Sequence, residues 1–213
     1  MKIWTQLKKV HNAITYKEVE SNEQDMNKIK FLLNGVVYGK NLCVRGNIYI
    51  FKHYESGKII IGDNVIINSA SWANPIGCGD RTYFQINEKA VLTIGNNCGI
   101  SNTAITCEEK VTIEDNVMIG SGCHIYDTDF HPLEYSERVK EYYKGCPTKR
   151  KPVRICEGAF IGAGCYILKG VTIGEHAIVG AGSVVAKDIP AGEIWVGNPA
   201  KYIKPVEPYG ENK

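Results

Sequence analysis

The sequence predicts an all-β fold, a parallel β-helix that carries a long inserted loop and a short N-terminal segment that is polar and partly helical. Three observations support this fold: aliphatic residues recur every sixth position, the recurrence stops at Asp127 and later resumes, and the first 35 residues are polar. A period of six matches neither a helix nor a simple alternating strand, so it describes a short strand followed by a sharp corner. Coils of this kind bury little surface alone and are stabilised by stacking.

Length and composition limit the classes to which this chain can belong. With 213 residues, 44% of them apolar, the chain can bury one core. The net charge of +2, from 25 basic and 23 acidic residues, gives no broad positive field, so we expect no nucleic-acid partner. The longest apolar run, residues 159–168, is too short and glycine-rich for a membrane span, and the first residues lack the apolar core of a signal peptide. We therefore expect a cytoplasmic protein without membrane insertion.

The N-terminal part of the chain precedes the regular repeat. Residues 1–35 contain a weakly helical stretch, "SNEQDMNKIKFLLNG", which Gly35 would end as a C-cap. Residues 36–60 are rich in strand formers but follow the six-residue period poorly, so we interpret them as irregular first coils. Proline and glycines in "SASWANPIGCGDRTYF", residues 69–84, predict a loop or a bulged coil.

The repeat itself is clearest after residue 150. Aliphatic residues stand at every sixth position: Ile155, Ile161, Ile167, Ile173, Val179 and Val185. Four positions after each stands a residue that is compact in most coils: Ala159, Cys165, Val171, Ala177, Ser183 and the bulkier Ile189. The same frame recurs at Ile113, Ile119 and Ile125, at Ile94 and Ile100, and at Ile61 and Ile67. We expect the aliphatic residues to form inward ladders, and we expect Cys98, Cys123 and Cys165, in the compact position, to be buried apolar groups.

The repeat is lost from Asp127 to about Pro152, a segment that begins with "DTDFHPLEY". Residues inserted into a stack without breaking it must leave the coil as an arm, and long loops on a rigid scaffold often carry function. His131 has an imidazole that titrates near neutrality and could act as a general base. Pro132 restricts its backbone to an extended conformation. The sequence does not choose which acid orients the second ring nitrogen: Asp127, Asp129 or Glu134.

The segment from Ile59 to Ile203 resembles the hexapeptide-repeat acyltransferases, whose pattern is an aliphatic residue, often followed by glycine, and a small residue four positions on. The resemblance implies that three six-residue sides make one coil of a left-handed parallel β-helix, an exception to the usual handedness of crossovers. It implies an acyltransferase domain over residues 36–203 with an arm at about 127–152, and a C-terminal tail at 204–213.

Two stretches, "IEDNVMIGSGCHIYDTDFHPLEY" and "KPVRICEGAFIGAGCYILKGVTIGEHAIVG", are similar to the branch that contains maltose, galactoside and capsule-sugar O-acetyltransferases. This resemblance implies an acetyl-CoA-dependent O-acetyltransferase that acts on a carbohydrate hydroxyl of a surface polysaccharide or its precursor. It implies that His131, in its His-Pro pair, is the base for direct transfer without an acyl-enzyme. It also implies a homotrimer with active sites between subunits, and no metal.

The stretch "SVVAKDIPAGEIWVGNPAKYIK" is similar to the C-terminal signature of the family, where acetyl-CoA binds. The residues that the resemblance places at the cofactor are Phe160, Gly162, Ala163, Ala181, Ala186, Lys187, Lys201 and Lys204. The backbone N–H of Gly162 or Ala163 would stabilise the oxyanion, and Lys201 and Lys204 would reach the CoA phosphates as point charges. Asn102 would contact the acceptor, and Phe160 stands where the family commonly has tryptophan.

Three other functions remain open from the sequence. One is an N-acetyltransferase that acts on an amino sugar or an antibiotic. Another is a zinc enzyme like the γ-type carbonic anhydrases, with His124, His131 and His176 as ligands. The third is a β-solenoid that binds or scaffolds without catalysis.

Overall fold

The computed structural model describes residues 23–52, 56–144 and 148–207, and it shows a solenoid with three parallel sheets as its sides. Sheet A consists of β1 (Val37–Tyr38), β4 (Lys58–Ile61), β7 (Val91–Ile94), β10 (Lys110–Ile113), β13 (Val153–Ile155) and β16 (Thr172–Ile173). Sheet B consists of β2 (Cys43–Gly46), β5 (Ile66–Ser69), β8 (Gly99–Ser101), β11 (Met118–Ile119), β14 (Phe160–Ile161), β17 (Ile178–Val179), β19 (Glu193–Val196) and β20 (Lys201–Pro205). Sheet C consists of β3 (Tyr49–Lys52), β6 (Tyr83–Ile86), β9 (Ala104–Cys107), β12 (His124–Tyr126), β15 (Tyr166–Ile167) and β18 (Val184–Val185).

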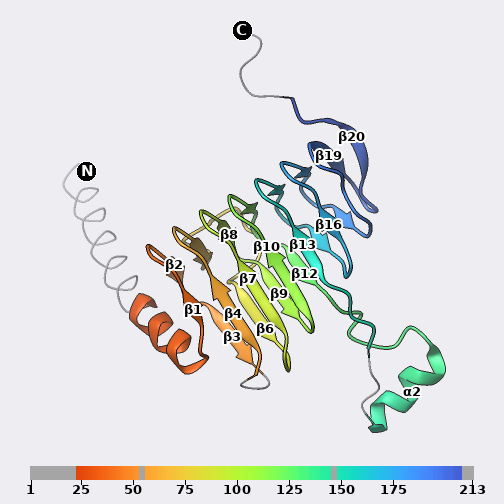
Figure 1. Ribbon diagram of the computed structural model, residues 1–213, viewed down its shortest axis with the longest axis horizontal. Helices are drawn as coiled ribbons and strands as arrows, with labels where there is room; N and C mark the ends of the chain where they lie inside the picture. The colour runs from red at the N-terminus through yellow and green to blue at the C-terminus, as the bar shows by residue number, and fades with distance from the viewer. Residues whose placement is uncertain (1–22, 53–55, 145–147, 208–213) are drawn as a thin grey trace, which may run out of the picture.

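The chain visits sheets A, B and C in turn, so one coil contributes one strand to each sheet (Figure 1). We name the turns between them the A/B, B/C and C/A corners. Strands of neighbouring coils pair in parallel register, for example Ile113 with Ile155 and Ile155 with Ile173. At the C-terminal end, β20 pairs antiparallel with β19 and closes sheet B. The parallel β-helix predicted from the six-residue period is confirmed.

The core is made by the repeat residues. Every aliphatic residue of the repeat and every residue of the compact position is buried, including the three cysteines predicted to be there. Each strand points alternate side chains inward, and a coil's inward residue stacks on its equivalents above and below. The ladders therefore form one continuous apolar column along the solenoid.

A helix covers the N-terminal end of this column. Its described part, residues 23–33, ends with Gly35 in the left-handed region at φ 59°. Val36 N–H donates to the carbonyl of Phe31, and Gly35 N–H donates to that of Leu32, which is the Schellman arrangement. Phe31 is buried against the first coil, so the helix shields the end of the stack from water. Neither helix in the described residues has the length and apolar composition of a membrane span.

Asparagines build the A/B corner. Asn41, Asn64, Asn97 and Asn116 all have left-handed φ angles of 57–61°, which their short side chains tolerate. Their amides form a ladder, with Asn64 donating to Asn97 at 3.0 Å and Asn97 donating to Asn116 at 3.2 Å. The corner is thus held by side-chain hydrogen bonds between coils as well as by the backbone.

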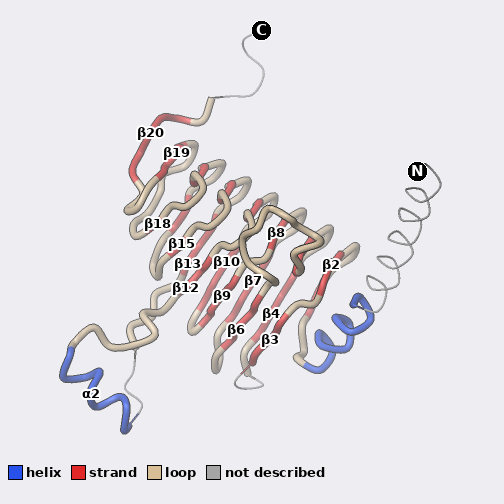
Figure 2. The backbone as a smooth tube through the Cα atoms, turned by 180° about the vertical axis from the view of Figure 1, so that it is seen from behind, coloured by secondary structure: helices blue, strands red, loops and turns tan. Residues whose placement is uncertain are grey.

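Two segments depart from the regular coils. Residues 70–82, between β5 and β6, form the loop predicted there, which we call the corner loop because it crosses the B/C corner. Residues 127–152, between β12 and β13, contain helix α2 (Tyr135–Lys144), which stands off from the sheets (Figure 2). We call this segment the arm. Thr128 bridges Arg150 at its base, so the two ends of the arm lie together.

Candidate functional site

His131 lies near the start of the arm, at the C/A corner. Its side chain is exposed, and its backbone N–H donates to the carbonyl oxygen of Asp129 at 2.7 Å. Phe130, between them, has a left-handed φ of 62°, which makes a tight turn. Lys169, which follows β15 in the next coil, holds Asp129 through a 2.6 Å ion pair between Nζ and Oδ1. The backbone that carries His131 is therefore tied to the solenoid.

The three acids proposed to orient His131 have different surroundings. Asp127 is buried, and its carboxylate accepts the backbone N–H groups of residues 108–110 at 2.7 to 2.8 Å. Burial raises the pKa of Asp127, and those N–H groups limit the rise because they stabilise the charged form. Glu134 is exposed at the start of α2. Asp129 Oδ2 is buried with no hydrogen-bond partner among the described residues, so Asp129 is the strongest of the three candidates.

A row of small residues follows the B/C corner. Strands β11, β14 and β17 pair in register, so the residues two positions after each strand lie in line. This row consists of Ser121, Ala163 and Ala181. Ser121 is buried beneath the corner loop and donates its hydroxyl to the carbonyl of Cys78, whereas Ala163 is half-buried and Ala181 is exposed. The row is therefore uncovered from Ala163 towards the C-terminal end.

The backbone distinguishes the two candidates for the oxyanion donor. Gly162 already donates its N–H to the carbonyl of Val179 at 2.8 Å, as part of the ladder between coils. Among the described backbone hydrogen bonds, none has the Ala163 N–H as its donor. Of the two residues, Ala163 is the one whose N–H remains available to an oxyanion.

Asn102 lies at the same B/C corner one coil before Ser121 and two coils before Ala163. Its residue surface is only 3% exposed, and its φ of 41° is left-handed. Neither its amide nitrogen nor its amide oxygen has a hydrogen-bond partner among the described residues. Buried amides are almost always paired, so an orphaned one needs an explanation such as a ligand or a water molecule.

His124 projects from the outer face of sheet C beside this corner. Its ring stacks on Tyr166 with centroids 4.6 Å apart and planes 11° apart. Its Nδ1 is 2.6 Å from the hydroxyl of Tyr126. Burial lowers the pKa of His124, which favours the neutral imidazole.

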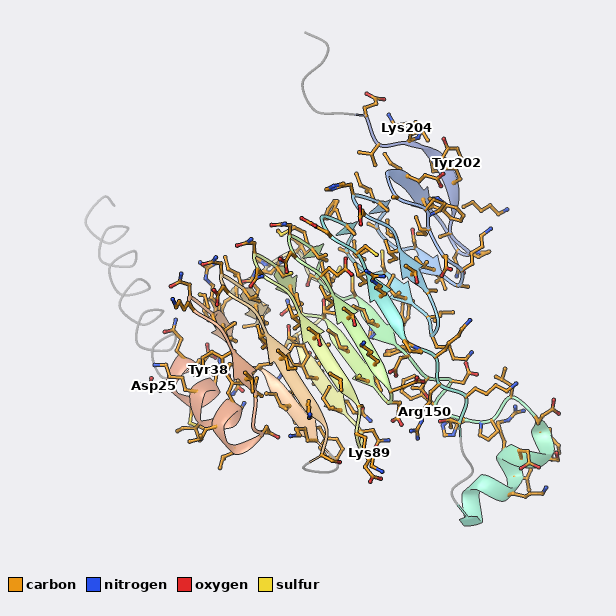
Figure 3. The ribbon with its side chains drawn as sticks, viewed as in Figure 1. Asp25, Tyr38, Lys89, Arg150, Tyr202 and Lys204 are labelled. Carbon is orange, nitrogen blue, oxygen red and sulfur yellow. The ribbon has the colours of Figure 1, made fainter. Side chains whose placement is uncertain are left out.

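The other residues implied by the family resemblance are more dispersed. Ala186 and Lys187 follow β18 at the C/A corner, and Lys187 Nζ lies 4.9 Å from the centroid of the Trp195 ring. Lys201 and Lys204 are exposed on β20, and Lys204 pairs with Glu207 at 2.8 Å. Figure 3 shows Lys204 at the far C-terminal end, distant from Arg150, which marks the base of the arm. Phe160 is exposed on the outer face of sheet B beside Met118.

The predicted site residues thus fall into two groups within one chain. His131 and Lys187 stand at the C/A corner, whereas Asn102, Ala163 and Ala181 stand at the B/C corner. Two corners of one solenoid are separated by the whole of sheet C. Sequence reasoning missed Lys169 and the corner-loop residues, because lysines after strands and irregular loops carry no repeat signal.

The three histidines considered as zinc ligands are also separated. His124 is on sheet C, His131 is in the arm, and His176 is exposed at the A/B corner with a φ of 56°. Within residues 23–52, 56–144 and 148–207, no three His, Cys, Asp or Glu side chains form a group that could hold a metal ion. The geometry therefore does not support this ligand set.

The fold and the residues at its corners together define a class of protein, a β-solenoid of six-residue repeats with an arm beside the C/A corner. The model for bacterial transferase hexapeptides (six repeats) matches residues 152–187, and that for the hexapeptide repeat of succinyl-transferase matches residues 110–125. These matches, which cover less than half of the chain, show that it is similar to the hexapeptide-repeat transferases.

Individual relatives show the same similarity. A Schizosaccharomyces pombe protein, whose name provisionally assigns it as an acetyltransferase, is 40% identical over 52% of this chain and 48% of its own length. The chain spans about half or less of the curated relatives that it matches. A hexapeptide-repeat acetyltransferase of Vibrio cholerae, complexed with acetyl coenzyme A, is 30% identical with a TM-score of 0.50, over 55% of this chain and 61% of that one. A variant of AntD, an N-acyltransferase of Bacillus cereus, was solved with dTDP and coenzyme A; it is 26% identical with a TM-score of 0.64, over 87% of this chain and 89% of that one.

Proposed function

We propose that this protein is an acetyl-CoA-dependent O-acetyltransferase that acts on a carbohydrate hydroxyl, in a surface polysaccharide or its precursor. The observation that carries the proposal is the row of small residues at the B/C corner, which is uncovered at Ala163 and Ala181 and leads to the orphaned amide of Asn102. Small residues let the slender pantetheine chain lie close to the backbone. The V. cholerae relative, which has the same repeat, binds acetyl coenzyme A.

The proposed reaction is direct transfer. The acceptor hydroxyl attacks the thioester carbonyl, and His131 takes the hydroxyl proton as the new C–O bond forms. The Ala163 N–H stabilises the oxyanion, and Asp129 holds the imidazole in position. The C–S bond then breaks, and the CoA thiolate leaves and is protonated. Lys187 would flank the pantetheine chain. Lys201 and Lys204 would bind the CoA phosphates, and Lys204 would exchange Glu207 for a phosphate oxygen.

The separation of the site residues favours a site built between two copies of the chain. In the proposed homotrimer, the C/A corner of one subunit, with His131, faces the B/C corner of the next, with Asn102 and Ala163. Ile66, Met118 and Phe160 form an exposed apolar stripe on the outer face of sheet B, of a kind that marks subunit contacts. The proposal also includes a left-handed winding of the coils, an arm over residues 127–152 and a cytoplasmic location.

The test is CoA release from acetyl-CoA in the presence of neutral sugars, sugar nucleotides and amino sugars, with the wild-type protein and His131→Ala. We expect a sugar to stimulate release and the substitution to remove at least about two orders of magnitude of the rate, the contribution typical of a general base. Acetyl-CoA that neither binds nor turns over would contradict the proposal and favour a non-catalytic solenoid.

A second candidate is an N-acetyltransferase that acts on an amino sugar or an antibiotic. The observation in its favour is the similarity to AntD, an N-acyltransferase that was solved with dTDP and spans most of this chain. The same panel separates the two, because an amino sugar would be preferred over its hydroxyl counterpart, and the product would resist mild base that cleaves esters.

A further inference from the structure

The outer face of sheet C carries a row of rings with one gap. Register pairing brings five residues of successive coils into line: Tyr49, Tyr83, Ala104, His124 and Tyr166. The rings of Tyr49 and Tyr83 are 5.6 Å apart, and those of His124 and Tyr166 are 4.6 Å apart. Only Ala104 lacks a ring, so a slot opens above it between Tyr83 and His124. We call this the ring slot.

The ring slot belongs to a cavity of roughly 330 Å³. Such a volume is at the lower end of the range of small-molecule sites, about 300–1,000 Å³. Asp80 and Arg81 of the corner loop form one wall, and Asn102 lies at the corner beside it. Gly164 also lines the cavity and directly follows Ala163, so the cavity adjoins the uncovered end of the small-residue row.

The spacing of the coils sets the thickness of what fits in the slot. Tyr83 and His124 are two strands apart in sheet C, which corresponds to about 9.6 Å between their backbones. A flat base in contact with a ring on each face needs about 7–8 Å. A puckered pyranose with axial hydrogens and hydroxyls is thicker, so the slot suits it better than a nucleobase.

The charges around the slot favour a neutral ligand. Asp80 and Arg81 are the only fully charged residues among those that line the cavity, and their side chains lie 3.5 Å apart, from Oδ2 to Nε. Tyr83 donates its hydroxyl to the same carboxylate. Because burial favours neutral His124, the lining carries no net charge.

Asn102 supplies a polar contact that the protein itself leaves unused. Its amide has one group that donates and one that accepts, and both are unpartnered among the described residues. A sugar hydroxyl or an acetamido group can satisfy both at once. A ligand that carries such a group would satisfy the orphaned amide of Asn102.

We infer that the ring slot is the acceptor-binding site and that it takes the pyranose ring of a neutral hexose or N-acetylhexosamine, held between Tyr83 and His124. This assignment of the acceptor rests on the proposed function, but binding in the slot does not require it. The ring would lie next to Ala163, where the acetyl group is expected.

The test is direct binding, measured by saturation-transfer NMR with titration, of the neutral methyl glycosides of glucose, galactose and N-acetylglucosamine. Methyl glucuronide represents an anionic sugar, and thymidine represents a flat nucleobase. A sugar nucleotide of the preferred hexose shows whether the acceptor sugar is linked to a nucleotide or stands at the end of a glycan. The variant Ala104→Tyr fills the slot. Thr93→Tyr is the matched control, because Thr93 lies on sheet A of the same coil.

We expect a neutral glycoside to bind, Ala104→Tyr to weaken it at least about tenfold and Thr93→Tyr to leave it unchanged. His124→Ala should weaken it about two- to tenfold, the size of a lost ring contact. The inference is overturned if no neutral glycoside binds, if thymidine or methyl glucuronide binds more tightly, or if Ala104→Tyr has no effect. Binding of acetyl-CoA is measured separately. If acetyl-CoA does not bind, the proposed function is contradicted. If acetyl-CoA binds but no neutral glycoside does, only the assignment of the ring slot is contradicted.

Discussion

At the scale of single residues, neighbouring acids in the arm have different tasks. Asp127 caps the turn at residues 108–110 and is buried, so it serves the stability of the stack. Asp129 is held by Lys169 and keeps one carboxylate oxygen unpartnered among the described residues. The sequence could not distinguish them, because both stand beside the same histidine and the coil that Asp127 contacts is distant in the chain.

Asp129→Asn tests the positioning of His131. We expect kcat to fall about tenfold or more, with KM for acetyl-CoA unchanged. The reason is that the substitution disturbs the proposed base, His131, and not the small-residue row where acetyl-CoA is proposed to bind. Glu134→Gln is the control, since Glu134 is exposed at the start of α2, and it should retain full activity. Equal losses in both variants would contradict the role of Asp129.

His124 gives a prediction for pH. Burial lowers its pKa from the usual 6.5, so the folded protein binds this proton less readily than the unfolded chain does. The contribution of His124 to the free energy of unfolding is therefore fully present at a pH above 6.5, and it is lost as the pH falls through the lowered pKa of the folded protein. We expect the unfolding free energy of the wild type to fall between about pH 7 and pH 5 more than that of His124→Gln. Urea titrations at both pH values measure the difference, and parallel losses would contradict it.

At the scale of elements, the regular coils were predictable and the irregular segments were not. The period of six located Ile113, Ile155 and Ile173, because each coil repeats the same burial requirement. The partners of the corner loop and the ties at the base of the arm depend on contacts between distant segments, which no local pattern carries. The ring slot follows from strand register, and the sequence alone does not show that Tyr83, Ala104 and His124 lie in line.

The asparagine ladder can be tested at Asn97. Replacement by glycine removes the hydrogen bonds to Asn64 and Asn116 but tolerates the φ of 57°. Replacement by alanine loses the same bonds and adds the strain of a side chain in the left-handed region, about 1–2 kcal/mol. We therefore expect Asn97→Ala to lower the unfolding free energy by about 1 kcal/mol more than Asn97→Gly, measured by urea denaturation. Equal stabilities would show that the corner carries no such strain.

At the scale of the whole molecule, the candidate site is divided between two corners of the solenoid. Family resemblance led us to expect a site between subunits, and the structure supplies a physical reason, since sheet C separates His131 from Ala163 within one chain. The resemblance supplied the candidate residues, whereas their division between two corners could be seen only from the strand order of the structure. The proposed function therefore places a complete site between the C/A corner of one chain and the B/C corner of another.

The most direct measurement is subunit complementation. His131→Ala lacks the base, and Ala181→Trp blocks the small-residue row, so each variant alone should release sugar-dependent CoA at no more than about a hundredth of the wild-type rate. After the two are unfolded and refolded together at equal concentrations, about a quarter of the sites should combine an intact histidine with an intact row, and about a quarter of the wild-type rate should return. If the wild type is active but the mixture stays as inactive as each variant alone, the site lies within one chain and not between two chains.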